Sequence, residues 1–133
     1  MTASARRTRC GRHLHLAVLV AAVIAIDARA ELVEIGWDKA GRFETTANVA
    51  PGKFAELCGR LDKGQSVAWS FMADRPLNFN IHYHQGKQVV FAAKQGAAVD
   101  AHGKLDVSLS QDYCWMWTNK GDLPAQLRIV LRR

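Results

Sequence analysis

The sequence predicts an all-β fold, a single antiparallel β-sandwich of about seven or eight strands that follows an N-terminal signal peptide. Apolar and polar residues alternate along most of the chain after residue 30, and this period of two is typical of strands with one buried face. Turn signals separate these runs about every ten residues, and no segment has a long helical period. The 133 residues are therefore expected to contain one folded domain, residues 31–133.

Residues 1–30 have the three parts of a Sec-type signal peptide. Four arginines come first, an apolar run follows at residues 16–26, and Ala28-Arg29-Ala30 fits the small-residue cleavage pattern. We expect cleavage after Ala30 and a mature protein that is periplasmic or secreted. The apolar run is shorter than the roughly 20 residues of a membrane-spanning helix, so no membrane span is expected in the mature chain. An uncleaved amphipathic anchor is the alternative.

Most of the net charge of +6 belongs to this leader. Without residues 1–30 the chain has 103 residues and a net charge of +2, because five arginines and one aspartate leave with them. The remaining lysines and arginines are scattered, and only Arg132 and Arg133 are adjacent. Because a nucleic-acid footprint needs a clustered basic patch, we expect no nucleic-acid partner.

Seven segments of the mature chain are expected to form strands because apolar residues recur at alternate positions. They are residues 43–49, 65–72, 77–84, 88–93, 104–110, 112–118 and 125–132. Turns are expected at Pro51-Gly52, Lys63-Gly64, Arg75-Pro76, Gln85-Gly86, His102-Gly103 and Asn119-Lys120-Gly121. Residues 31–39 fit either a short helix or an edge strand.

Aromatic side chains occupy the apolar positions of three of these strands. Because each buries a large apolar area, we assign six of them to the core: Trp69, Phe71, Phe79, Tyr83, Trp115 and Trp117. The Tyr113 hydroxyl is expected to hold down a loop. Asn119 is expected to open the turn that follows it by bonding to its own backbone.

Three segments resemble the GOLD domain, a small β-sandwich of early secretory pathway cargo receptors. They are residues 67–71 (VAWSF), 77–84 (LNFNIHYH) and 113–119 (YCWMWTN), followed by a last apolar strand. The resemblance covers about residues 64–132. The chain is also similar to small exported bacterial proteins that carry F-N-x-H-Y-H and Y-C-x-M-W-T-N strands. The resemblance implies a GOLD-like or jelly-roll-like sandwich that binds proteins or lipids and does not catalyse a reaction.

The mature chain keeps two cysteines, Cys58 and Cys114, because Cys10 lies in the leader. In an exported protein such a pair is most simply a disulfide. Closing a loop of this length would contribute about 4 kcal/mol on the chain-entropy model.

A second interpretation gives Cys114 a different role. His82 and His84 are two apart on an expected strand, so both imidazoles point to the face opposite the core. Cys114 and Met116 are also two residues apart, and they lie on the face of their expected strand opposite its aromatic side chains. If the two strands are neighbours, these four side chains form a soft ligand set for copper, or for zinc with three of the four.

Other arrangements of these residues stay open at the sequence level. Met72 and His102 could serve as additional ligands. The two histidines could instead be polar surface, with Met116 filling a gap. Cys114 cannot serve fully in both a disulfide and a metal site, but His82, His84 and Met116 could bind copper with the disulfide intact.

The sequence carries no Gly-x-Ser-x-Gly elbow, no His-Glu-x-x-His helix, no phosphate loop and no dinucleotide fingerprint. We therefore expect an exported, non-enzymatic binding or accessory protein of the cell envelope whose partner is a protein or a small ligand. The alternative is a periplasmic protein that binds copper or zinc.

Overall fold

The computed structural model describes residues 31–133 and is all-β, as predicted, with no helix in that range. The strands are β1 (Glu31–Glu34), β2 (Arg42–Val49), β3 (Phe54–Leu61), β4 (Ser66–Gln85), β5 (Gln88–Asp106), β6 (Gln111–Thr118) and β7 (Ala125–Arg132). All pairings are antiparallel except that of β1 with β3, which is parallel. The predicted signal peptide lies outside the described residues.

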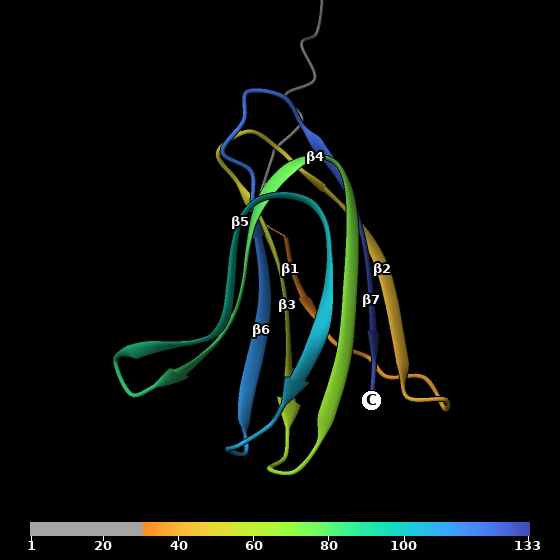
Figure 1. Cartoon of the computed structure of the whole chain (residues 1–133), viewed down its shortest axis with the longest axis vertical. Helices are drawn as coiled ribbons and strands as arrows, with labels where there is room; N and C mark the ends of the chain where they lie inside the picture. Colours follow the sequence, from red (N-terminus) through yellow and green to blue (C-terminus); the bar gives the residue numbers. More distant parts are fainter. Residues whose placement is uncertain (1–30) are drawn as a thin grey trace, which may run out of the picture.

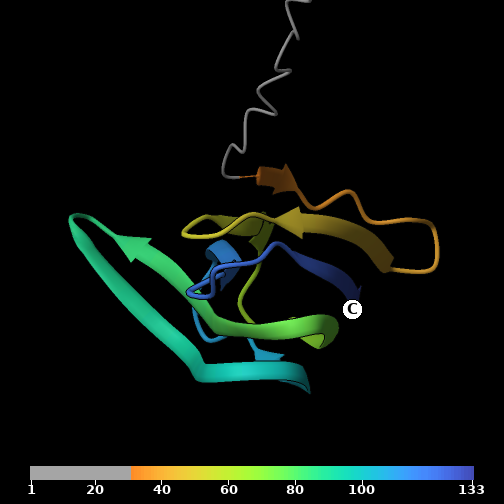
Figure 2. The same ribbon diagram turned by 90° about the horizontal axis from the view of Figure 1, so that it is seen from above.

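The long ribbon of β4 and β5 organises the molecule (Figure 1). The strand order is β1-β3-β6-β4-β7-β2, and β5 pairs with β4 outside this path. The first half of β4 pairs with β7, and its second half pairs with β6. The ribbon therefore bends and contributes one half to each layer of a nearly closed sandwich, which Figure 2 shows end-on. The end of the ribbon projects from the body (Figure 1).

The turn predicted at Arg75-Pro76 is wrong, because β4 continues through these residues with a bend. Residues 65–72 and 77–84 were expected to be separate strands joined at Arg75-Pro76, but both lie in the single strand β4. The register with β5 shifts between Met72 and Leu77, on either side of this dipeptide. Proline has no amide hydrogen to donate, so it fits an irregular stretch of a strand and not a regular ladder. The dipeptide marks a bend where the sequence indicated a turn.

The turn predicted at His102-Gly103 is also wrong, because both residues lie inside β5. Gly103 pairs with Trp69, and a Cβ atom on this glycine would lie 2.6 Å from Cζ2 of the indole. The glycine is needed there because an aromatic ring lies against its backbone. By contrast, the turn predicted at Gln85-Gly86 is confirmed, with Gly86 at a φ of 60°.

Strand β3 was not predicted, because its inward positions carry a weak apolar signal. Ala55 and Leu57 are buried, but the next inward position is Gly59, which packs against Ile35. The strand expected at residues 104–110 is likewise only partly present, since β5 ends at Asp106. Residues 31–34 form an edge strand, which decides between the two alternatives for that segment.

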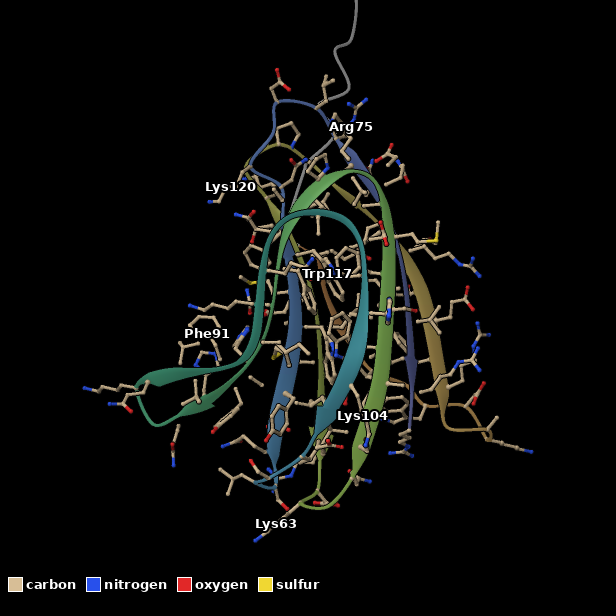
Figure 3. All side chains as sticks on the ribbon, in the orientation of Figure 1. Lys63, Arg75, Phe91, Lys104, Trp117 and Lys120 are labelled. Carbon is tan, nitrogen blue, oxygen red and sulfur yellow. A yellow bond between two sulfur atoms is a disulfide. The ribbon has the colours of Figure 1, made fainter. Side chains whose placement is uncertain are left out.

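The aromatic core is confirmed. Trp115 and Trp117 are fully buried, and Phe71 and Phe79 pack against Trp117 with ring centroids 5.7 and 5.3 Å away. Trp69 is partly buried and lies 4.8 Å from Phe79. Tyr83 is partly buried and packs against Tyr113 at 5.1 Å. Figure 3 shows Trp117 near the middle of the body.

Two polar side chains hold the loops at the ends of β6. The Tyr113 hydroxyl donates to the carbonyl of Leu109 at 3.1 Å, as expected of a residue that holds a loop. The buried Asn119 accepts from the amide of Gly121 at 2.9 Å, which confirms its turn. Its Nδ2 also donates to the carbonyls of Val49 and Leu123, both at 2.8 Å. Within residues 31–133 no helix is long and apolar enough to cross a membrane.

Candidate functional site

The outer face of β3, β6 and β4 brings together residues that the sequence left on separate strands. In the register of the sheet His82 lies opposite Cys114, and Asn80 lies opposite Met116. On the other side of β6, Cys58 lies opposite Cys114, and Glu56 lies opposite Met116. The neighbouring strands on which the metal-site interpretation depends are therefore present.

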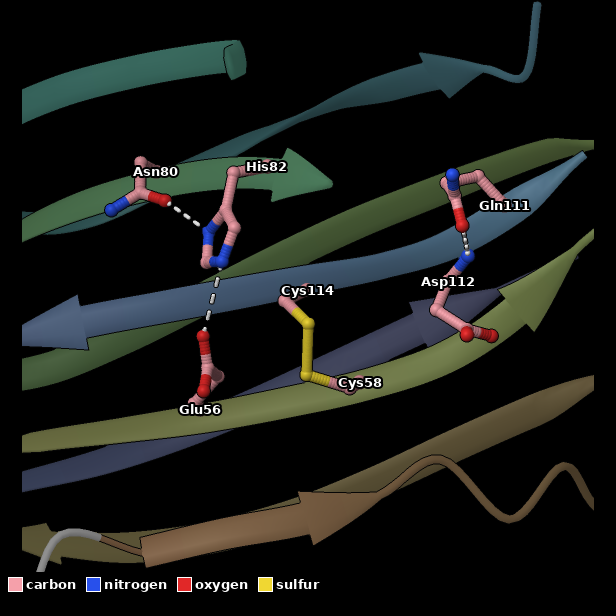
Figure 4. The surroundings of a disulfide bond; sticks show 7 residues. All are labelled: Glu56, Cys58, Asn80, His82, Gln111, Asp112 and Cys114. Atoms are coloured by element: carbon pink, nitrogen blue, oxygen red, sulfur yellow. Dashed lines mark hydrogen bonds and ion pairs between the residues drawn. A yellow bond between two sulfur atoms is a disulfide. The ribbon is translucent and has the colours of Figure 1, made fainter. Parts of the chain in front are cut away.

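Cys58 and Cys114 form a disulfide, with an S–S distance of 2.07 Å (Figure 4). The bond joins β3 to β6 at one register position, and the sulfur atoms lie within 4.8 Å of a carboxylate oxygen of Glu56. A bonded sulfur is not a thiolate, and metals bind the thiolate. Of the four ligands suggested by the sequence, the two histidines and Met116 remain free of this bond.

His82 is the buried polar group of this face. Only 5% of its surface is exposed, and each ring nitrogen has a polar neighbour. Nδ1 lies 2.8 Å from Oδ1 of Asn80, and Nε2 lies 3.3 Å from Oε1 of Glu56 (Figure 4). Burial lowers the pKa of His82 below its ordinary value, although the Glu56 carboxylate acts to raise it and His84 lowers it further.

The sequence interpretation missed Glu56. Its side chain approaches His82 across β6, the strand between β3 and β4. The signal was present but unused, because Glu56 and Cys58 are two residues apart and share one face of a strand. Without an assignment of β3 as a strand, this relation could not be recognised.

The remaining ligand candidates lie at different distances from His82. His84 is exposed, and its ring centroid is 5.4 Å from that of His82. The structure does not bring Met72 and His102 to this site, because they pair with Arg128 and Ser70 on the first half of the β4–β5 ribbon.

Phe91 and Lys94 of β5 form the other side of the face. The Phe91 ring lies 6.0 Å from the His82 ring, and the Lys94 ammonium lies 3.5 Å above the Phe91 ring. An open groove of about 400 Å³ adjoins them, and its lining includes Asn80 and Lys120. This groove presents ammonium groups, an amide and an aromatic ring to solvent.

The free edge of β5 is the second distinctive surface. Within residues 31–133 β5 pairs only with β4, so its other edge has no backbone partner along 19 residues. Three large apolar side chains of this strand, Val89, Phe91 and Val99, are each 44% exposed. Figure 3 shows Phe91 on the part of the ribbon that leaves the body.

No family model and no curated protein sequence matches the chain. Among solved structures, it resembles the pre-peptidase C-terminal domain of collagenase from Bacillus anthracis, with a TM-score of 0.61 at 10% identity over 77% of this chain and 96% of that one. It also resembles PliG, a periplasmic lysozyme inhibitor of g-type lysozyme. The Aeromonas hydrophila PliG has a TM-score of 0.55 at 11% identity, with coverage of 78% and 98%. The Salmonella Typhimurium PliG has a TM-score of 0.55 at 11% identity, with coverage of 77% and 97%. These likenesses confirm a small β-sandwich, and the resemblance to the GOLD family stays a prediction.

Proposed function

We propose that this protein is an exported, non-enzymatic accessory domain that binds a protein partner along the free edge of β5. The unpaired edge itself is the observation that carries the proposal. Natural sheets protect such edges with short strands, charges, prolines or covering elements, because a free edge pairs with any extended chain. β5 is long, and its projecting half carries the consecutive residues Val89, Val90 and Phe91.

An extended segment of a partner can add to such an edge as a further strand. Main-chain hydrogen bonds then supply affinity, and alternate side chains supply specificity. Val89 and Phe91 are two residues apart and point to the same side, so they form an apolar pair beside the new strand. Lys94 adds a positive charge nearby and favours a partner with an acidic residue at that point.

The fold neighbours support this kind of role. PliG is an inhibitor of g-type lysozyme, and the collagenase neighbour is a domain that accompanies an enzyme. A β-sandwich of this size therefore serves elsewhere as an exported protein-binding module. A g-type lysozyme is the first defined probe for binding and inhibition.

The test of the docking edge is photocrosslinking from single positions in the exporting cell. A photoreactive residue replaces Val89 in one variant and Lys63, an exposed residue in the turn before β4, in the control. We expect a discrete heterologous adduct from position 89 and none from position 63. Equal labelling from both positions, or an adduct that contains only a second copy of this chain, would overturn the proposal. Fractionation of the same cells tests export.

A second candidate function is the binding of copper or zinc by His82, His84 and Met116. The close approach of the two imidazole rings on one outer face favours it. A bound ion stabilises the folded state by mass action, so Cu²⁺ or Zn²⁺ should raise the melting temperature of the disulfide-bonded protein. If neither ion raises it, this second function is refuted.

A further inference from the structure

The hydrogen-bonding pattern of His82 places its Nε2 atom against a carboxylate oxygen of Glu56. Oδ1 of Asn80 lies 2.8 Å from Nδ1 of His82, and with the amide assigned in this orientation Nδ1 is the donor. In the neutral imidazole Nε2 is then an acceptor. This acceptor faces another acceptor, Oε1 of Glu56, at 3.3 Å.

Two acceptors at this distance are close enough to share one cation. A proton on Nε2 would make an ordinary ion pair with the Glu56 carboxylate. A metal ion fits the spacing as well. Two ligand atoms that each lie about 2.0–2.1 Å from a tetrahedral Zn²⁺ are about 3.4 Å apart.

We propose that Glu56 and His82 form a binding site for Zn²⁺, with Nε2 of His82 and a carboxylate oxygen of Glu56 as ligands and His84 as the third. The inference rests on the second candidate function and changes its ligand set. His84 is exposed and its ring is already 5.4 Å from that of His82, so a side-chain rotation can bring a nitrogen to the ion. Two imidazole nitrogens and one carboxylate oxygen are ligands that zinc accepts, whereas Cu⁺ prefers sulfur.

The surroundings hold these ligands in place. Metal-bound histidines almost always donate their other ring N–H to an oxygen, and Asn80 supplies that oxygen here. The disulfide joins β3 to β6 two residues from Glu56 and directly opposite His82. It therefore fixes β3, the strand that carries Glu56, with respect to β6, while the exposed His84 side chain still has to rotate toward the ion.

The test is zinc titration of the exported protein by calorimetry, after chelator treatment and with the disulfide intact. Glu56→Gln keeps the shape of the side chain and removes its charge, so zinc affinity should fall at least about tenfold. His84→Ala should also weaken binding. The matched controls are Asp100→Asn and His102→Ala, an exposed acid and an exposed histidine on the other half of β5, and both should bind zinc as the wild type does.

Different results would refute the Glu56–His82 zinc site and the second candidate function. If Glu56→Gln binds zinc as tightly as the wild type, or if copper binds and zinc does not, this site is refuted while the second candidate function stands. If no ion binds the wild type, both fail. An independent readout is the nitrogen-15 spectrum of the imidazoles. Zinc should shift Nε2 of His82 and leave Nδ1 protonated, and a proton that stays on Nε2 at saturating zinc would overturn the assignment.

Discussion

Gly103→Ala is expected to destabilise the fold by about 1–2 kcal/mol, because the new methyl group would meet the indole of Trp69. An added Cβ would lie 2.6 Å from Cζ2 and 2.9 Å from Cε2 of that ring. The ring must move by most of an ångström to reach an ordinary contact, but it is packed against Phe79 at 4.8 Å. Overpacking of this kind costs about 1–3 kcal/mol. Alanine also has less conformational entropy than glycine in the unfolded chain, and this offsets about 0.4–1 kcal/mol of that cost.

The matched control is Gly96→Ala in the same strand. There an added Cβ has only Asn78 Oδ1 nearby, at 3.8 Å, so the substitution should be neutral or slightly stabilising. Urea and thermal unfolding followed by circular dichroism measure both variants, and Gly103→Ala should melt about 4–16 °C lower than the wild type. In a Trp69→Ala background its cost should disappear. Equal stability of the two glycine variants would refute the packing argument.

Three other substitutions test the remaining structural features. Replacing Cys58 and Cys114 by serine should lower the free energy of unfolding by about 4 kcal/mol, measured by denaturant titration, and a reducing agent should have no further effect on that variant. Asn119→Ala removes three hydrogen bonds in a buried position and should cost about 2–3 kcal/mol in the same assay, whereas a loss under 0.5 kcal/mol would contradict its structural role. Because burial lowers the pKa of His82, the metal-free folded state should lose stability as the pH falls below about 6.5, where the unfolded chain takes up the proton first. His82→Gln should flatten the stability curve between about pH 7.5 and 5, and an unchanged slope would show that His82 does not carry this dependence.

The candidate site was predictable only in part. The face of His82 and His84 followed from a spacing of two residues, and the disulfide followed from the two cysteines outside the expected leader. Glu56 could not be assigned, because its strand has small residues at inward positions and the usual alternation of large apolar side chains is weak there. The burial of His82 was also unexpected. The His82 ring has neighbours on three strands: Glu56 of β3, Asn80 of β4 and Phe91 of β5.

The sequence by itself determined the all-β class and the aromatic core face of three strands, and it favoured a disulfide between Cys58 and Cys114 over a metal-ligand role for Cys114. These follow from local spacing and residue counts, which need no knowledge of which strands are neighbours. Only the tertiary structure decided that β4 bends at Pro76 and serves both layers, that the edge of β5 is free within the described residues, and that Glu56 meets His82 across β6. Lateral strand pairing joins residues far apart in the chain, and the period of two within a strand is the same whichever neighbour it has.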